Sequence, residues 1–276
     1  MYVRRAAHLL HGKGVLTVGP NRTAPRLGGA ARDRFFERGQ RQLARLAREI
    51  EAHTGCTLES RRALDFGCGV GRLALPLAER CEYVYGLDVS RPALRLADRD
   101  AKRRNLANVE WLEASRLAEL SGRYDLVLSM LVFQHIPSRE GERIFDTLVR
   151  GLRPGGVGAI QIALRPSRPM AGFARSRSKQ RPAGSSPVNL VSGWNWSYPY
   201  MLVHSYSLNR LGELLAAAGA REWHVRWHPR DGAHEIVTIV FQKSDKAIER
   251  RSAGGQANGA VPAQPPPDPM APGADA

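Results

Sequence analysis

The chain has 276 residues, 43% of them apolar, which suffices for the core of one α/β domain with extensions. The formal net charge of +15 permits a nucleic-acid partner, although most basic residues are arginine, a bias that a GC-rich coding background also produces. No apolar stretch approaches the roughly 20 residues of a membrane helix. The run from Ala6 to Leu10 is too short for a secretory signal, so we expect no membrane span and a cytoplasmic location.

The N-terminal part of the sequence predicts an irregular arm followed by a helix. Residues 1–30 are rich in Gly and Pro and lack a long periodic pattern, so they are expected to form an arm. From about 32 to 52 apolar residues recur at helical spacing. On this helix Phe35, Phe36 and Gly39 either close over a pocket or, for the two aromatic residues more simply, pack in the core.

Residues 63–72 predict a strand that runs into a glycine loop and a helix. A short apolar run ends in Asp65, and Gly67, Gly69 and Gly71 follow at alternate positions. Glycines suit a loop that wraps a ligand, because they accept positive φ and allow close backbone approach. The backbone N–H groups of this loop are therefore a candidate binding surface.

A second strand ends in an acid about 20 residues further on, at the position where dinucleotide-binding domains hold a ribose. The strand is Tyr83 to Leu87 and the acid is Asp88, which can accept both ribose hydroxyls of an adenosine cofactor. Gly69 to Ala74 also fits G-x-G-x-x-G/A, so a nicotinamide or flavin dinucleotide is one reading. Asp65 argues against a dinucleotide, because its carboxylate would repel a pyrophosphate. It suits a cationic ligand such as S-adenosylmethionine (SAM).

The cysteines indicate neither a disulfide framework nor a metal site. Cys56, Cys68 and Cys81 lack C-x-x-C spacing, so no metal is expected. Cys68, inside the glycine loop, is expected to contribute its small size and its backbone.

Helices and strands alternate beyond the glycine loop, as a doubly wound sheet requires. Ser90 followed by Arg91 and Pro92 predicts a helix start just after Asp88. We expect helices near 71–80, 91–105 and 138–151, and strands near 82–87, 108–112, 124–129 and 157–163.

The last third of the sequence predicts a cover, a helix, a hairpin and a tail. The periodic pattern stops from about 164 to 205, a segment with a basic first part and an aromatic second part, Trp194 to Tyr200. Since it leaves the carboxyl end of a strand, we interpret it as an active-site cover. A helix at 207–219 and strands at 222–227 and 235–242 follow, and residues 245–276 predict a disordered tail.

The motifs together resemble those of the class I SAM-dependent methyltransferases. The acid and glycine loop at residues 65–71 resemble the first motif of this family. Residues 124–129 resemble its fourth-strand motif, 133–137 the segment that follows in many small-molecule members, and 152–156 the turn into its fifth strand. The resemblance implies a doubly wound, seven-stranded Rossmann-like α/β fold in three layers, with an antiparallel C-terminal strand, over residues 31–244.

The resemblance also implies which residues contact SAM. It places the methionine end at Asp65, the glycine loop and the backbone of Ser129 and Met130, with the ribose at Asp88. The adenine would lie near Ser115, where many members carry an acid that is missing here, and Glu113 is the nearest substitute. The full set of expected cofactor contacts is Asp65, Gly67, Cys68, Gly69, Gly71, Asp88, Val89, Ala114, Ser115, Arg116, Ser129 and Met130.

The expected reaction transfers a methyl group to an O or N nucleophile of a small-molecule, glycan or lipid-linked acceptor. His135 is a candidate general base that is often structural in relatives, and His204 and Tyr206 are weaker candidates. Nucleic-acid methylation is an alternative, but residues 129–132 lack the Pro-Pro and aromatic pattern of base-amine methylation. An NAD(P)-dependent oxidoreductase and a non-catalytic SAM-binding protein remain as readings of another class, and no oligomeric state is indicated.

Overall fold

The computed structural model describes residues 29–59, 61–164, 188–195, 198–228 and 235–245. Most of the predicted arm, the basic part of the predicted cover and nearly all of the predicted tail lie outside these residues. The secondary-structure elements belong to one unit, which ends at Ser244.

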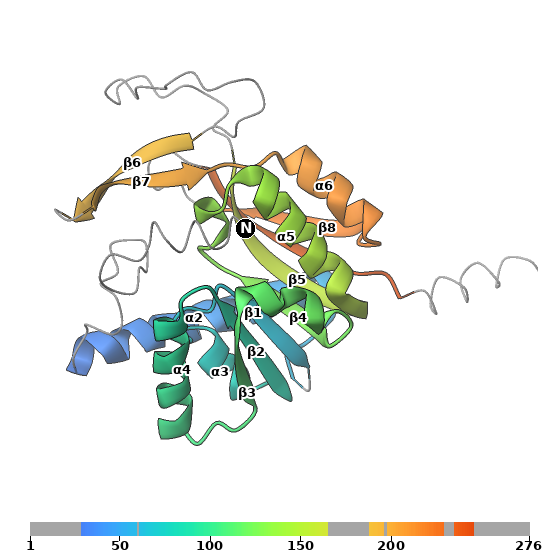
Figure 1. The fold of residues 1–276 in the computed structure, drawn as a ribbon. Coiled ribbons are helices and arrows are strands. Elements are labelled where there is room, and N and C mark those ends of the chain that lie inside the picture. The colour runs from blue at the N-terminus through green and yellow to red at the C-terminus, as the bar shows by residue number, and fades with distance from the viewer. Residues whose placement is uncertain (1–28, 60, 165–187, 196–197, 229–234, 246–276) are drawn as a thin grey trace, which may run out of the picture. The chain divides into compact units, whose positions relative to one another are not determined.

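Seven strands form one mixed sheet in the order β3-β2-β1-β4-β5-β9-β8 (Figure 1). Pairing is parallel from β3 through β5, whereas β9 is antiparallel to both β5 and β8. This is the predicted Rossmann-like sheet with an antiparallel C-terminal strand. The strands are β1 (Arg62–Phe66), β2 (Tyr83–Asp88), β3 (Val109–Glu113), β4 (Tyr124–Ser129), β5 (Leu152–Leu164), β8 (Glu222–Trp227) and β9 (Glu235–Gln242).

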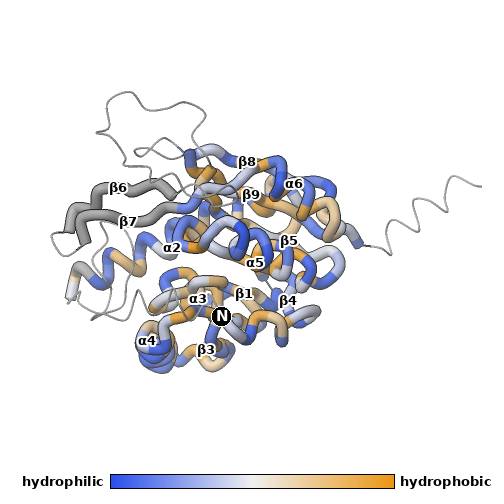
Figure 2. Tube along the Cα trace, turned by 45° about the horizontal axis from the view of Figure 1, so that its top comes forward, coloured by the Kyte–Doolittle hydropathy of each residue, from blue (hydrophilic) through white to orange (hydrophobic). Residues whose placement is uncertain are grey.

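Helices cover both faces of the sheet, so the fold has the predicted three layers. One face packs on α5 and α6 through Phe145, Leu148 and Leu211, and the other packs on α2 and α3 through Leu46 and Leu77. In Figure 2 the tubes of α2 and α4 alternate between hydrophobic and hydrophilic stretches, as amphipathic helices do. The α-helices are α2 (Gly29–Thr54), α3 (Ala74–Ala78), α4 (Arg91–Arg103), α5 (Ser138–Gly151) and α6 (Leu208–Ala217).

Two short 3-10 helices follow strands at the carboxyl edge of the parallel part of the sheet: η2 (Ala114–Leu120) after β3, and η3 (Phe133–His135) after β4. The predicted cap of α4 is present, since the Ser90 side chain accepts a hydrogen bond from the Ala93 N–H. Among the described residues, no helix is both long and apolar enough to cross a membrane.

Three elements differ from the sequence prediction. The helix expected at 71–80 is confined to α3, because the chain from 71 to 73 is still turning out of the glycine loop. The strand expected at 157 begins at Leu152, and the Pro-Gly-Gly turn protrudes where the register with β4 shifts. The segment expected to lack a periodic pattern contains an antiparallel hairpin, β6 (Val188–Asn195) and β7 (Tyr198–His204).

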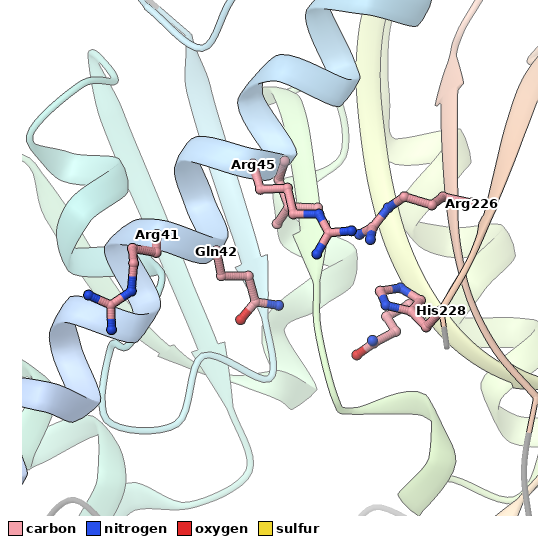
Figure 3. A pocket seen from close by; sticks show the side chains of 7 residues that line it. Arg41, Gln42, Arg45, Arg226 and His228 are labelled. Atoms are coloured by element: carbon pink, nitrogen blue, oxygen red, sulfur yellow. The ribbon is translucent and has the colours of Figure 1, made fainter. Parts of the chain in front are cut away.

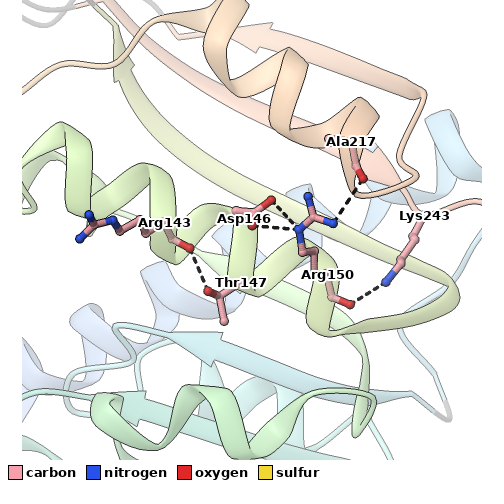
Figure 4. Close-up of polar contacts among 6 residues, drawn as sticks. All are labelled: Arg143, Asp146, Thr147, Arg150, Ala217 and Lys243. Carbon is pink, nitrogen blue, oxygen red and sulfur yellow. Dashed lines mark hydrogen bonds and ion pairs between the residues drawn. The ribbon is translucent and has the colours of Figure 1, made fainter.

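Polar contacts tie the end of α5 to α6 and to the residue that follows β9 (Figure 4). Lys243 Nζ donates hydrogen bonds to the carbonyl oxygens of Arg150 (2.6 Å) and Leu152 (2.8 Å). The Arg150 guanidinium contacts Asp146 one turn earlier and donates to the Ala217 carbonyl oxygen of α6. A cation at these carbonyls satisfies acceptors that have no partner within the helix.

Candidate functional site

The glycine loop leaves β1 at the point where the strand order reverses, between β2 and β4. Ligands of doubly wound folds bind in the crevice at such a switch point. Gly67, Gly69 and Gly71 have φ values of +77°, +56° and +82°, a region that side chains rarely occupy. A Cβ on Gly67 would lie 2.2 Å from the Val132 side chain, whereas one on Gly69 would meet no atom within 4 Å. The loop therefore packs against the chain after β4 and is open at Gly69.

Asp65 is a buried carboxylate that lacks a full set of donors. It is only 3% exposed, and its Oδ2 atom has no hydrogen-bond partner among the described residues. Burial raises its pKa to about 7, with Asp88 adding to the shift and Arg72 opposing it. A buried charged oxygen without a donor is costly, so the site favours a ligand that brings a cationic donor.

Asp88 lies at the end of β2 and holds the neighbouring backbone. Its Oδ2 accepts a hydrogen bond from the Gly69 N–H (2.9 Å), and its Oδ1 accepts one from the Ser90 N–H (2.8 Å). Burial raises the pKa of Asp88, while these backbone hydrogen bonds lower it. Each carboxylate oxygen has two lone pairs, so both can accept a further donor such as a ribose hydroxyl.

Trp111 of β3 lies beneath the glycine loop, a placement that the sequence analysis did not identify. A Cβ on Gly86 would lie 2.5 Å from the Trp111 ring, and one on Gly71 would lie 3.1 Å from it. The available sequence signal was Gly86, because a glycine inside a strand often marks a place where another group approaches closely; in the β2–β3 register it pairs with Trp111. Burial, reinforced by Asp88 and Asp65, raises the pKa of the Cys68 thiol, so this cysteine is a neutral packing residue at pH 7.

The residues expected near the adenine flank the end of β3. Ala114 is half-buried, whereas Ser115 and Arg116 are exposed, and Arg116 pairs with Glu119 at 2.8 Å. Glu113 pairs with Arg91 at 2.7 Å, so a role with adenine would require this ion pair to open. Val89, beside Asp88, is 40% exposed. These adenine contacts stay predictions.

The end of β4 combines a buried serine with a strained leucine. Ser129 is fully buried, and its hydroxyl donates to the Phe66 carbonyl oxygen at 2.9 Å. Its expected backbone contact with the cofactor stays a prediction. Leu131 has a φ of +63°, which is unusual for a branched residue. Its N–H donates to Gln161 Oε1 at 3.0 Å. Backbone strain of this kind concentrates at functional sites.

His135 lies in η3, two residues beyond Phe133 and close to the end of β4. Burial, together with the nearby His204, lowers the pKa of His135 to about 4, so its imidazole is neutral at pH 7. Tyr206 fixes this turn, because its hydroxyl lies 2.9 Å and 2.8 Å from the carbonyl oxygens of Phe133 and Ile136. Tyr206 thus positions the turn, and its hydroxyl already has partners.

Helix α2 packs on the outer side of the glycine loop. Phe35 and Phe36 are buried in an apolar cluster with Val70, which agrees with the core-packing interpretation. A Cβ on Gly39 would lie 2.2 Å from the Arg72 carbonyl oxygen, so the helix approaches the loop closely there. Arg72 Nη1 donates to Gln42 Oε1 at 2.5 Å, which joins α2 to the charged groups around Asp65.

Comparison with protein families identifies this arrangement. Residues 63–156, from β1 into β5, match the family model described as a methyltransferase domain. This part of the chain belongs to the class I SAM-dependent methyltransferases.

Curated methyltransferases are similar over part of the chain. The ubiquinone biosynthesis O-methyltransferase of Acinetobacter baylyi is 34% identical over 110 residues, which are 39% of this chain and 45% of that protein. The trans-aconitate 2-methyltransferase of an Azoarcus species is 30% identical over 173 residues, 60% of this chain and 65% of that protein. The chain thus spans less than half of the first of these methyltransferases.

Solved methyltransferase structures share the fold. The magnesium protoporphyrin IX methyltransferase of Synechocystis with bound SAM aligns with a TM-score of 0.50 at 16% identity, over 87% of this chain and 91% of that one. The 1,6-didemethyltoxoflavin-N1-methyltransferase of Burkholderia thailandensis aligns with a TM-score of 0.50 at 21% identity, over 75% and 79% of the two chains. At these identities the likeness supports the Rossmann-like methyltransferase fold.

Proposed function

We propose that this chain transfers a methyl group from SAM to an O or N nucleophile of a small-molecule, glycan or lipid-linked acceptor. The observation that carries the proposal is the buried, unpartnered Oδ2 of Asp65 at the base of an open glycine loop. When bound, SAM would supply an electrophilic methyl group on its sulfonium: attack of the nucleophile on the methyl carbon would form a C–O or C–N bond while the C–S bond breaks and S-adenosylhomocysteine leaves. The protein contributes mainly by orienting the reactants in a pocket from which water is excluded.

The residues around the switch point suit SAM, both in the charge of Asp65 and in the open space beside Gly69. Its ammonium group is a cationic donor of the kind that Asp65 lacks. The opening at Gly69 admits a ligand against the loop backbone. The ribose hydroxyls can use the remaining lone pairs of Asp88 without displacing its hydrogen bonds from Gly69 and Ser90.

His135 is the residue we propose to accept the proton from the nucleophile. Its imidazole is neutral at pH 7 and can accept a proton, and its pKa of about 4 makes it a weaker base than an ordinary histidine. Tyr206 and the η3 turn hold it near the end of β4. Transfer of a proton to a positioned base of this kind contributes about 10²- to 10⁴-fold to rate.

The proposal has competitors in other functional classes. A nicotinamide cofactor would bring its pyrophosphate to the loop beside Asp65, where the carboxylate disfavours a second negative charge. The names of the similar curated methyltransferases refer to small molecules, which supports a small-molecule acceptor over nucleic acid. A cytoplasmic location stays a prediction.

Calorimetric titration with SAM and S-adenosylhomocysteine, with NAD and NADP as controls, tests the cofactor. Micromolar binding of the two adenosyl-sulfur ligands alone is the expected result. Binding of NAD or NADP without SAM would move the protein to the oxidoreductases. Transfer of labelled methyl to a panel of acceptors then separates an enzyme from a protein that binds SAM without turnover.

A further inference from the structure

A pocket of about 370 Å³ lies between α2, β5 and the end of β8 (Figure 3). Helix α2 contributes Arg41, Gln42 and Arg45, and the side chains of Gln161, Arg226 and His228 line it from the sheet side. Figure 3 shows the guanidinium groups of Arg45 and Arg226 pointing toward one another across the pocket. Several positive charges close together repel one another, and a bound anion would relieve this repulsion.

The strand register places the polar side chains of this pocket in one row. Gln161 on β5 pairs with Thr238 on β9, and Thr238 pairs with Arg226 on β8. Side chains alternate between the faces of a strand, so these three share the face that α2 covers. Two residues before Gln161 the same face carries Ala159, which packs in the apolar core. The polar row therefore interrupts that core near the ligand-binding edge.

The charges in the pocket are not balanced by its own carboxylate. Glu49 Oε1 lies 2.6 Å from Arg226 Nε and 3.4 Å from Arg45 Nε, so one carboxylate serves two guanidinium groups. Arg226 Nη1 and Glu49 Oε2 are both buried without a hydrogen-bond partner among the described residues, so this ion pair does not satisfy all of its own donors and acceptors. Arg41 adds a third positive charge, and its partner Glu37 is an exposed residue at 3.7 Å. A bound oxyanion would supply the missing acceptor, which is worth more to a charged donor than to a neutral one.

His228 lines the pocket at the end of this polar row. Its Nε2 lies 2.8 Å from Thr238 Oγ1, which fixes the ring at the end of the row. Burial lowers its pKa, and the nearby Arg226 and Arg45 lower it further, with Glu49 opposing them. The ring thus adds no charge of its own at pH 7, and the arginines remain the cationic groups of the pocket.

Two glutamines connect this pocket to the proposed cofactor site. Gln161 accepts from the Leu131 N–H, two residues beyond the last residue of β4. Gln42 accepts from Arg72, whose positive charge acts on Asp65. Because β8 and β9 are separated from β2 and β3 by β1, β4 and β5, the pocket extends away from the expected adenosine site.

We propose that this pocket binds a carboxylate or phosphate group of a small acceptor and so selects anionic acceptors for methylation. This proposal rests on the proposed function. A volume of about 370 Å³ falls within the range of small-ligand sites, roughly 300–1,000 Å³. Paired guanidinium groups match the geometry of either oxyanion.

The test is calorimetric titration with citrate and with inorganic phosphate, at saturating S-adenosylhomocysteine. The proteins are the wild type, Arg45→Gln, Arg226→Gln and, as a matched control, Arg48→Gln, which removes an exposed arginine of the same helix from outside the pocket lining. We expect the wild type and Arg48→Gln to bind at least one of the anions equally, and both pocket variants to bind it at least tenfold more weakly. A preference for citrate assigns the site to a carboxylate, and a preference for phosphate assigns it to a phosphate group.

Other outcomes overturn the proposal. Absence of anion binding by the wild type, or equal binding by all four proteins, would leave Arg226 and Glu49 as a structural ion pair. Loss of S-adenosylhomocysteine affinity in Arg45→Gln would assign this arginine to the carboxylate of the cofactor. A single-stranded RNA is titrated in parallel: if Arg45→Gln and Arg226→Gln lose affinity for the RNA but keep that for citrate and phosphate, the pocket is assigned to nucleic acid.

Two readouts keep this experiment decisive. Thermal unfolding shows whether each variant is folded. If Arg226→Gln does not fold, the anion affinity of Arg45→Gln alone tests the proposal. If the wild type binds the anion through the two arginines but binds no S-adenosylhomocysteine, the proposed function fails while the anion site stands.

Discussion

The Gly69 N–H donates a 2.9 Å hydrogen bond to Asp88 Oδ2, and this contact joins the glycine loop to the end of the neighbouring strand. The two groups lie 19 residues apart in sequence. They meet because β1 and β2 pair in parallel, so that their carboxyl ends share one edge of the sheet. The carboxylate therefore organises the loop as well as offering acceptors to a ligand.

Asp88→Ala is expected to weaken SAM binding by about 1.5–3 kcal/mol, the usual range for hydrogen bonds to a charged group. This corresponds to roughly 10- to 150-fold in Kd, measurable by calorimetry. Asp98→Ala, which removes only a surface contact with Lys102 on α4, is the matched control and should leave Kd unchanged. An unaltered affinity in Asp88→Ala would remove this residue from the ribose site.

Asp65→Asn is expected to stabilise the ligand-free protein while weakening SAM binding. The pKa of Asp65 is about 7 in the folded protein against an ordinary value of 3.8. Between these values the unfolded chain has lost the proton while the folded protein keeps it, so stability declines as pH rises to about 7. Asp65→Asn does not lose stability in this way. Its melting temperature should therefore exceed that of the wild type at pH 8, and the difference should be absent below about pH 4.

The affinity for SAM is expected to change with pH in the opposite direction to the stability. The charged form of Asp65 binds the ammonium group, so wild-type affinity for SAM should fall as pH decreases below about 7. Asp65→Asn should bind at least tenfold more weakly at pH 8 and show less pH dependence. A variant that loses both stability and affinity would identify Asp65 as a structural anchor of the loop.

The sequence was sufficient for the sheet and for the acids at its edge. Asp65 and Asp88 each end an apolar run, and parallel strands bring such ends together. The β6–β7 hairpin was not predicted, because the residues of this segment lack the alternation that indicates strands. The arginine pocket depends on the register that aligns Gln161, Thr238 and Arg226, and a register between distant strands leaves no local pattern.

His135→Asn separates a catalytic histidine from a structural one. If His135 is the base, methyl transfer should fall by about 10²- to 10⁴-fold while S-adenosylhomocysteine affinity is retained. The folded pKa of about 4 lies below the ordinary 6.5, so the unfolded chain binds a proton first as pH falls. Wild-type stability should therefore decline between pH 6.5 and 4, and the variant should show a smaller decline. Full activity in His135→Asn, with the smaller decline still present, would make the residue structural.

Leu131→Gly is expected to slow methyl transfer with little change in stability. A left-handed backbone costs a residue with a side chain about 1–2 kcal/mol, and the greater freedom of glycine in the unfolded chain offsets about 0.4–1 kcal/mol of the gain. Leu131 is 40% exposed, so its truncation also loses apolar burial worth about 1–2 kcal/mol. We expect the free energy of unfolding in urea to stay within about 1 kcal/mol of the wild type. Asn105→Gly is the matched control, because Asn105 also has a positive φ, +55°, and lies away from the end of β4, so its turnover should be unchanged. A loss of much more than about 1 kcal/mol in Leu131→Gly would show that the side chain is needed for packing, whereas slower turnover at unchanged stability would place this residue in the catalytic site beside the end of β4.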